Sequence, residues 1–113
     1  MSWCTFCRIA EGEAPGRIVY RDQYLTAFHD RNPQAPTHVL IIPNKHIESV
    51  TNLKEDDAEL IGKLFVAARQ IAEEEGLEAG YRLVVNTGSQ AGQSIFHLHV
   101  HLLGGRALGW PPG

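Results

Sequence analysis

The sequence predicts an α+β fold, in which one long helix packs against an antiparallel sheet, and three observations favour it. Segments with the pattern of strands outnumber helical segments. Two of the strand segments are separated only by Asp22 and Gln23, which is the length of a tight hairpin turn. One long segment carries apolar residues at helical spacing. Together these elements are typical of a meandering sheet covered by a helix.

The N-terminal half of the chain contains a short helical turn and three strand segments. We expect the turn over residues 5–10 and the first two strands over residues 17–21 and 24–29. A rigid loop with two prolines follows. It leads into residues 38–42, a β-rich run that we expect to end at Pro43.

The long helix is expected from Lys54 to Glu75. Asn52 followed by Glu55 suits a capping box, and Gly76 suits a C-terminal stop. One apolar stripe runs along the helix and is expected to face the sheet; its members are Leu60, Ile61, Leu64, Phe65, Ala68, Ile71 and Ala72.

The C-terminal half of the chain supplies the last two strands. We expect a fourth strand over residues 81–86, a small polar loop over residues 87–93, and a fifth strand over residues 94–103. The tail from Trp110 to Gly113 contains two prolines and an indole, so it is too stiff and apolar for a purely solvated end.

Composition limits the classes of protein and partner. With 113 residues, 43% hydrophobic and 20% charged, we expect one folded domain over residues 1–113 and no long disordered segment. A net charge of −3 and a pI near 6.0 argue against a nucleic-acid polymer as partner, although a small anionic ligand stays possible. Because the sequence has neither a membrane-length apolar run nor a signal pattern, we expect no membrane association and a cytoplasmic location.

Three of the six histidines occupy alternate positions of the fifth strand segment. Side chains alternate between the two faces of a strand, so His97, His99 and His101 should share one face. Consecutive imidazoles would then lie about 7 Å apart and face outward. The opposite face, which should point into the core, would carry Phe96, Leu98, Val100 and Leu102.

This histidine pattern leaves four interpretations open. It could be the polar side of a half-buried strand, which is the least favoured because all three residues are histidines. It could be a catalytic zinc site, since histidines at i and i+2 can share a metal. It could perform acid–base catalysis without covalent attack. It could also hold a nucleophilic histidine between phosphate-binding ones, because neutral imidazole is abundant at pH 7 and attacks phosphorus well.

The only two cysteines, Cys4 and Cys7, are too few and too close for a secreted disulfide framework. The Cys-x-x-Cys spacing suits a redox pair, two ordinary thiols, or half of a zinc site.

The run from His97 to Leu103 (His-Leu-His-Val-His-Leu-Leu) resembles the signature of the histidine-triad (HIT) superfamily. Segments 28–30, 33–38, 81–86, 92–94 and 110–113 look like its Hint branch, so the resemblance covers nearly the whole chain. It implies a HIT-like fold with a five-stranded antiparallel sheet, one long helix and a short N-terminal helix. It also implies a homodimer whose sheets join into a ten-stranded one, with Trp110 reaching the neighbouring active site.

The resemblance implies hydrolysis of the P–N bond of purine nucleoside 5′-phosphoramidates, as in adenosine 5′-monophosphoramidases. His99 would attack phosphorus and form a nucleotidyl-histidine intermediate, while a main-chain carbonyl near His97 accepts the proton of its other ring nitrogen. His101 and Asn86 would hold phosphate oxygens, and Ser94 would assist the leaving group. The implied catalytic set is His99, His101, His38 and Ser94.

The resemblance also implies a nucleotide pocket. Asp30 fits a carboxylate that accepts both ribose hydroxyls, although an aspartate before Asn32-Pro33 also suits a simple turn. Backbone N–H groups around residues 92–94 would add oxyanion-type stabilisation. Two residues depart from the Hint pattern: Ala91 replaces a frequent glycine and Arg31 a frequent apolar residue. The implied nucleotide contacts are Asp30, Phe28, His29, Phe6, Ile9, Asn86, Gly92, Gln93 and Trp110.

Relatives of the Cys-x-x-Cys type bind zinc, and the resemblance implies a closed, structural Cys₂His₂ site with no open coordination position. Its ligands here would be Cys4, Cys7, His46 and His97. No organic cofactor is expected. The alternatives are dinucleoside polyphosphate hydrolysis or nucleotidyl transfer, metal-dependent hydrolysis, and a non-enzymatic nucleotide-binding module.

Overall fold

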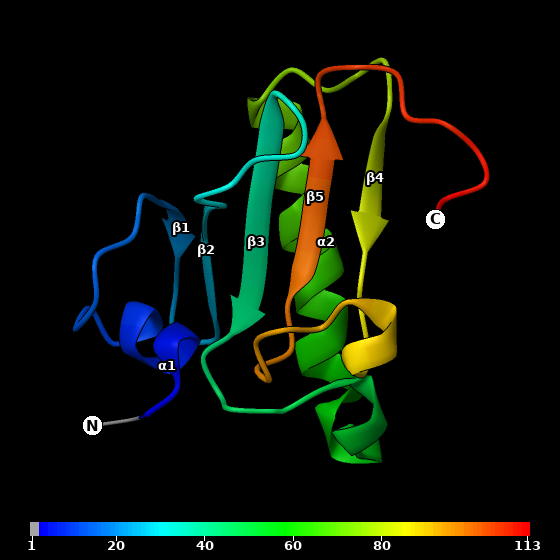
Figure 1. Ribbon diagram of the computed structural model, residues 1–113. Helices are drawn as coiled ribbons and strands as arrows, with labels where there is room; N and C mark the ends of the chain where they lie inside the picture. Colours follow the sequence, from blue (N-terminus) through cyan, green and yellow to red (C-terminus); the bar gives the residue numbers. More distant parts are fainter. Residues whose placement is uncertain (1–2) are drawn as a thin grey trace.

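The computed structural model describes residues 3–113 and confirms the α+β prediction. Five strands form one antiparallel sheet in the order β1-β2-β3-β5-β4. The helix α2 covers one face of the sheet behind β3, β5 and β4, and α1 lies beside the end of β2 (Figure 1). The elements are α1 (Thr5–Ala10), β1 (Ile18–Arg21), β2 (Leu25–His29), β3 (Thr37–Pro43), the 3₁₀ turns η1 (Val50–Asn52) and η2 (Glu55–Asp57), α2 (Ala58–Glu74), β4 (Tyr81–Val84), η3 (Ser89–Ala91) and β5 (Val100–Gly104).

The predicted hairpin between the first two strands is present although its turn contains no glycine. Tight hairpin turns usually contain a glycine with positive φ. Here the Asp22 carboxylate closes the turn instead, because its Oδ1 accepts hydrogen bonds from the backbone N–H groups of Tyr24 and Leu25, both at 2.8 Å. An aspartate side chain that closes a turn in this way needs no residue with positive φ.

The core lies between α2 and the sheet. From the predicted stripe, Leu64, Ala68, Ile71 and Ala72 are buried, as is Ala67, while Leu60 and Ile61 are partly buried against the core. Phe65 was expected in this core, but its side chain is 43% exposed. Each helical residue turns by about 100°, so the position after Leu64 falls outside the contact with the sheet.

The helix begins later than predicted. The 3₁₀ turn η2 precedes α2, and the carboxylate that caps this region is that of Asp57, which accepts the N–H of Lys54 at 3.0 Å. The predicted capping box of Asn52 and Glu55 is wrong, because Asn52 instead accepts the hydroxyl of Ser49 at 2.8 Å. The bond from Lys45 Nζ (2.7 Å) and the Lys54 N–H hold the pKa of Asp57 below its usual value.

The helix ends where the sequence predicts. Gly76 has a φ of +73°, a left-handed conformation that glycine adopts without strain. The following Leu77 N–H bonds the Ala72 carbonyl at 2.9 Å, which closes the last turn.

The fifth strand is shorter than predicted and starts at Val100 rather than at residue 94. Its pairing with β3 stops at Ile41↔Val100, and β3 ends at Pro43, which has no N–H to extend the ladder. Upstream, Leu98 N–H bonds the Ile47 carbonyl at 2.7 Å instead. Residues 94–99 therefore follow the loop after β3, and Phe96, which was expected in the core, is 42% exposed.

The histidines consequently do not form an outward row on one strand, as was expected. His97 and His99 precede β5 and both are buried, and only His101 lies on the regular strand. In the part of the chain that the structure describes, no helix is long and apolar enough to cross a membrane.

Candidate nucleotide site and metal centre

His99 is held in one orientation by the backbone of its own segment. Its Nδ1 lies 2.7 Å from the carbonyl oxygen of His97, so Nδ1 carries the proton and Nε2 keeps its lone pair. The ring of Phe6 packs edge-on against it, with centroids 5.2 Å apart. This is the arrangement that a histidine nucleophile needs, and the acceptor is the carbonyl that the resemblance implied.

His101 lies beside His99, with ring centroids 4.9 Å apart. Its Nδ1 is 2.9 Å from Nε2 of His38. Its Nε2 is buried and has no hydrogen-bond partner among residues 3–113. Burial, and then the neighbouring His99 and His38, lower the pKa of His101 to about 4, so its ring is neutral at pH 7.

His38 is the second residue of β3 and is almost fully buried. Its Nδ1 accepts the backbone N–H of Gln34 at 3.0 Å. Burial lowers the pKa of His38, and the carboxylate of Asp30 partly opposes this effect. His38, His99 and His101 therefore meet in one cluster, although they come from two strands and the segment between them.

Asp30 divides its carboxylate between two tasks. Its Oδ1 accepts the backbone N–H of Asn32 at 2.8 Å, which is the turn that the sequence left open as an alternative. Its Oδ2 lies 3.4 Å from Nε2 of His38. The half-buried side chain thus lies at the edge of the histidine cluster.

Asp30, His38 and His101 bring three potential ligand atoms within 4.8 Å, yet they do not suit a metal ion. The Gln34 N–H needs the lone pair of His38 Nδ1, so the proton of His38 is on Nε2, where a metal would bind. That proton bridges to His101 at 2.9 Å. The hydrogen bonding therefore disfavours the catalytic-metal interpretation of the histidines.

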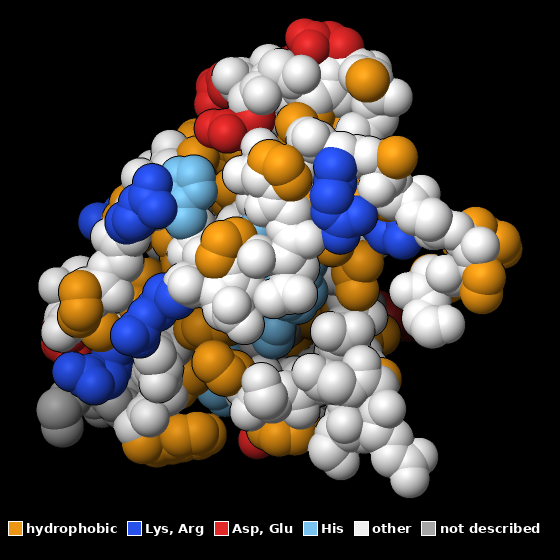
Figure 2. Space-filling model, turned by 45° about the horizontal axis from the view of Figure 1, so that its top comes forward, with side chains coloured by type: hydrophobic (Ala, Val, Ile, Leu, Met, Phe, Trp, Pro, Cys, Tyr) orange, Lys and Arg blue, Asp and Glu red, His pale blue; other side chains and the backbone are white. Residues whose placement is uncertain are grey.

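The aromatic and aliphatic residues predicted as base walls are buried in a second core. Phe6 and Phe28 meet edge to face at 5.3 Å, and Ile9 belongs to the same cluster. His29, at the end of β2, is half-buried. Figure 2 shows histidine side chains in the middle of one face, between apolar and polar neighbours. These walls stabilise α1 against the sheet, whatever they also contact.

The loop between β4 and β5 is held from inside by Gln93. Its Oε1 accepts the N–H of Gly88 at 2.9 Å, and its Nε2 donates to the carbonyls of Glu48 (2.7 Å) and Ile95 (3.2 Å). This buried side chain therefore braces the loop. The Gln93 N–H also bonds the Gly88 carbonyl at 3.1 Å, so both the side-chain amide and the N–H of Gln93 are engaged within the protein. The sequence gives no sign of this bracing role, because a glutamine between Gly92 and Ser94 looks like an ordinary polar loop residue.

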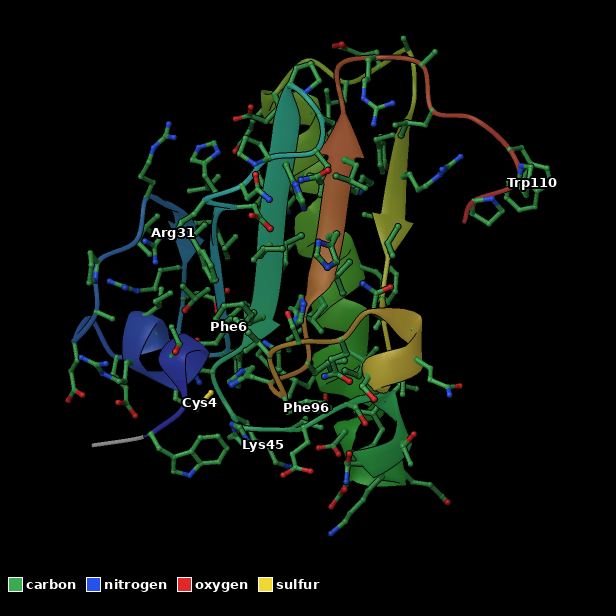
Figure 3. All side chains as sticks on the ribbon, viewed as in Figure 1. Cys4, Phe6, Arg31, Lys45, Phe96 and Trp110 are labelled. Carbon is green, nitrogen blue, oxygen red and sulfur yellow. The ribbon has the colours of Figure 1, made fainter. Side chains whose placement is uncertain are left out.

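The other predicted contacts lie around this loop or away from it. Gly92 has a φ of +95°, and a Cβ there would lie 3.9 Å from Asn86 Nδ2, so these two residues are neighbours. Ser94 is exposed and lines a surface depression with Trp3 and Phe96. Trp110 is 83% exposed and lies beyond β4, on the side of the molecule opposite Phe6 (Figure 3).

The four predicted metal ligands converge at the N-terminus of α1. Cys4 caps this helix, its Sγ accepting the N–H of Cys7 at 3.4 Å. His97 Nδ1 lies 3.4 Å from both sulfur atoms, and His46 Nδ1 lies 3.3 Å from Cys7 Sγ and 3.2 Å from His97 Nδ1. All four ligand atoms lie within 4.8 Å of one another.

This cluster is compatible with a metal site of the zinc type. Tetrahedral bonds of 2.0–2.3 Å separate neighbouring ligand atoms by about 3.3–3.8 Å, close to the distances observed. His97 Nε2 donates to the Pro43 carbonyl at 2.8 Å, so its Nδ1 lone pair faces the cluster. Burial is the main cause that lowers the pKa of His97 to about 4, which keeps the ring in its neutral, ligating form.

Similarity to known proteins agrees with this geometry. A model of the HIT domain matches residues 11–108. The chain is 50% identical over 111 residues to the 14 kDa zinc-binding protein of Zea mays, covering 96% of this chain and 86% of that protein. A HIT family hydrolase from Legionella pneumophila has a similar structure, with a TM-score of 0.96, 51% identity, and coverage of 97% and 99% of the two chains.

A histidine triad nucleotide-binding protein from Candida albicans is more distant, with a TM-score of 0.81, 29% identity, and coverage of 96% and 82%. These matches confirm the resemblance to the histidine-triad superfamily and its Hint branch. The chain belongs to the HIT domain family.

Proposed function

We propose that this protein is a nucleotide-specific hydrolase that cleaves the P–N bond of purine nucleoside 5′-phosphoramidates through a covalent intermediate on His99. The observation that carries the proposal is the 2.7 Å bond between His99 Nδ1 and the His97 carbonyl, which leaves a lone pair on Nε2. The names of two similar proteins, a hydrolase and a nucleotide-binding protein, support the coarser part of this function.

The reaction proceeds in two displacements. His99 Nε2 attacks phosphorus, the P–N bond to the leaving amine breaks, and the amine nitrogen takes up a proton from solvent through the exposed Ser94 hydroxyl. Water then attacks the nucleotidyl-histidine, the bond between phosphorus and His99 breaks, and the nucleoside monophosphate leaves. Two displacements replace one difficult attack by water on a charged centre.

The remaining predicted residues bind the nucleotide. His101 Nε2, which has no hydrogen-bond partner among the described residues, and the Asn86 amide donate to phosphoryl oxygens. The loop at Gly92 and Gln93 lies beside Asn86, and its own N–H groups bond the carbonyls of Ser89 and Gly88 at 3.1 Å. The Asp30 carboxylate accepts the ribose hydroxyls. The base lies against the side chains Phe6, Ile9, Phe28 and His29.

The active form is a homodimer. β4 is an edge strand of the sheet, and such an edge is stabilised when another strand pairs with it. Two copies paired there would form the expected ten-stranded sheet. The exposed Trp110, which lies beyond β4 (Figure 3), would then be placed to reach the site of the second copy.

Zinc bound by Cys4, Cys7, His46 and His97 would serve as a structural ion. It would tie α1 to the loop after β3 and to the segment before β5, which are the elements that hold Phe6 and His99. Structural zinc contributes directly to folding stability, and a closed four-ligand site supplies no catalytic water.

Steady-state hydrolysis of an adenosine 5′-phosphoramidate with a fluorescent amine tests the proposal, with wild type and His99→Ala compared. The variant should lose at least about 10³-fold in kcat/KM and should keep its melting temperature and its affinity for AMP. Mass spectrometry of acid-quenched wild type should detect an adenylylated chain.

Dinucleoside polyphosphates are assayed in parallel. Faster hydrolysis of these substrates would move the protein to another activity of the family. Absence of phosphoramidate turnover in a folded, AMP-binding wild type would reject the phosphoramidase, and a binding module would become the better account.

A further inference from the structure

The loop before β3 is held from both sides at Gln34. Its N–H donates to His38 Nδ1 at 3.0 Å, and its carbonyl accepts Nη2 of Arg106 at 2.8 Å. Arg106 follows β5, and its neighbour Gly105 has a φ of +92°. A Cβ on Gly105 would lie only 2.8 Å from Pro36, so the chain after β5 packs directly against this loop.

These contacts determine which ring nitrogen carries the proton, first in His38 and then in His101. A neutral imidazole has one N–H, and the Gln34 N–H requires a lone pair on His38 Nδ1, so the proton of His38 is on Nε2. His38 Nε2 therefore donates to His101 Nδ1 at 2.9 Å. The proton of His101 must then be on Nε2, which is the buried atom without a partner in the described chain.

We infer that the main-chain N–H of Gln34 and the side chain of Arg106 are positioning groups, which fix the tautomers of His38 and His101 so that His101 Nε2 presents an N–H to a phosphoryl oxygen. The identity of that oxygen rests on the proposed function. Arg106 acts indirectly: it bonds the carbonyl of Gln34 and so orients the residue whose N–H donates to His38.

The opposite tautomers would reverse the chemistry of the site. If His38 carried its proton on Nδ1, His101 would donate from Nδ1 and would present a lone pair at Nε2. That lone pair would repel a phosphoryl oxygen. The lone pair on His38 Nε2 would also face Asp30 Oδ2 at 3.4 Å. Burial lowers the pKa of both rings, so both are neutral at pH 7 and each carries a single N–H on one of its two nitrogens.

A matched pair of substitutions separates the N–H of Gln34 from its side chain. Gln34→Pro removes the donor, and Gln34→Ala keeps it while losing the side-chain bond to the Asn32 carbonyl. The ¹⁵N shifts of the full-length labelled protein near pH 7 report which ring nitrogens are protonated. Wild type and Gln34→Ala should show lone pairs at Nδ1 and protons at Nε2 of both rings, whereas Gln34→Pro should show mixed tautomers.

The catalytic consequence is measured on the same proteins. Gln34→Pro should lower kcat/KM for the phosphoramidate about tenfold, the effect of one misdirected hydrogen bond, and Gln34→Ala should stay within about twofold of wild type. Unchanged tautomers in a folded Gln34→Pro would overturn the inference.

Arg106→Ala provides a second variant if Gln34→Pro fails to fold. It should broaden or mix the two tautomers and lower kcat/KM about threefold to tenfold, and Arg106→Lys should restore part of both. Wild-type tautomers in Arg106→Ala would remove Arg106 from the proposal. Because ¹⁵N shifts are read without substrate, they test this inference even if the wild type does not hydrolyse phosphoramidates.

Discussion

The two histidine clusters use the same side chain in opposite ways. Around His97, lone pairs of two rings and two sulfur atoms converge on one point, and the His97 proton faces away to the Pro43 carbonyl. Around His38 and His101, each ring donates to the next, so that an N–H is left at the end. At His97 and His38 a backbone group on one ring nitrogen determines what the other nitrogen offers. The Pro43 carbonyl takes the His97 proton and leaves a lone pair toward the sulfur atoms, whereas the Gln34 N–H takes the lone pair of His38 and leaves a proton toward His101.

The largest expected effect separates the clusters by their response to metal. Cys7→Ser, or removal of metal by a chelator, should destabilise the protein by several kcal/mol, because ligand binding contributes directly to folding. Thermal melting with and without added zinc measures this effect. His101→Gln should retain the full response to zinc, and an equal loss of that response in both variants would contradict the separation.

A smaller effect is expected at the contact that supports the second cluster. Gly105→Ala introduces a Cβ at 2.8 Å from Pro36 and a side chain at a φ of +92°, so it should cost about 2–3 kcal/mol. Urea unfolding gives this value. Gly62→Ala is the matched control, since an exposed helical glycine with nothing within 4 Å should gain up to about 1 kcal/mol. A neutral Gly105→Ala would show that the loop after β5 can move away.

The smallest and most gradual effect concerns pH. The folded pKa of His101 is lowered from 6.5 to about 4, by burial first and then by His99 and His38, against an opposing effect of Asp30. Its neutral form is thus favoured in the folded state, so stability is complete above the unfolded pKa of 6.5 and falls as pH decreases from 6.5 to 4.

Unfolding free energies at pH 7 and pH 5 measure this loss. His101→Gln should show a shallower decline than wild type, because one of the groups that resist protonation is gone. The Cys4–Cys7–His46–His97 cluster is the same in both proteins, so the difference reports His101 and its contacts with His38 and His99. Parallel declines would show that His101 contributes nothing to the acid sensitivity.

Regular elements and motif residues were predictable from the sequence. The bounds of α1 and the stop at Gly76 follow from local patterns, and the four predicted metal ligands meet as the resemblance implied. The course of residues 94–99 was not predictable from alternation, because a long-range contact decides it: the ladder ends at Pro43, whose carbonyl then binds His97. The alternation of side chains along a strand carries no information about such a distant hydrogen-bond partner.

The supporting contacts of the site were also out of reach. Gln34 acts through its main-chain N–H and carbonyl, which every residue except proline possesses. Arg106 lies 72 residues away in the chain and looks like an ordinary surface arginine in the sequence. The prediction that Phe65 is buried was wrong for a simpler reason, because helical spacing defines the direction of an apolar stripe but not its width.

His97 binds two neighbours with chemically independent parts. Its ring belongs to the cysteine cluster, whereas its carbonyl orients His99. A carbonyl is common to all twenty amino acids, and a metal-ligating ring is not. Replacing the cysteines and this ring with packing side chains would therefore remove the cluster and keep the carbonyl that orients the His99 ring, so the stability of this region and the orientation of His99 can be changed independently.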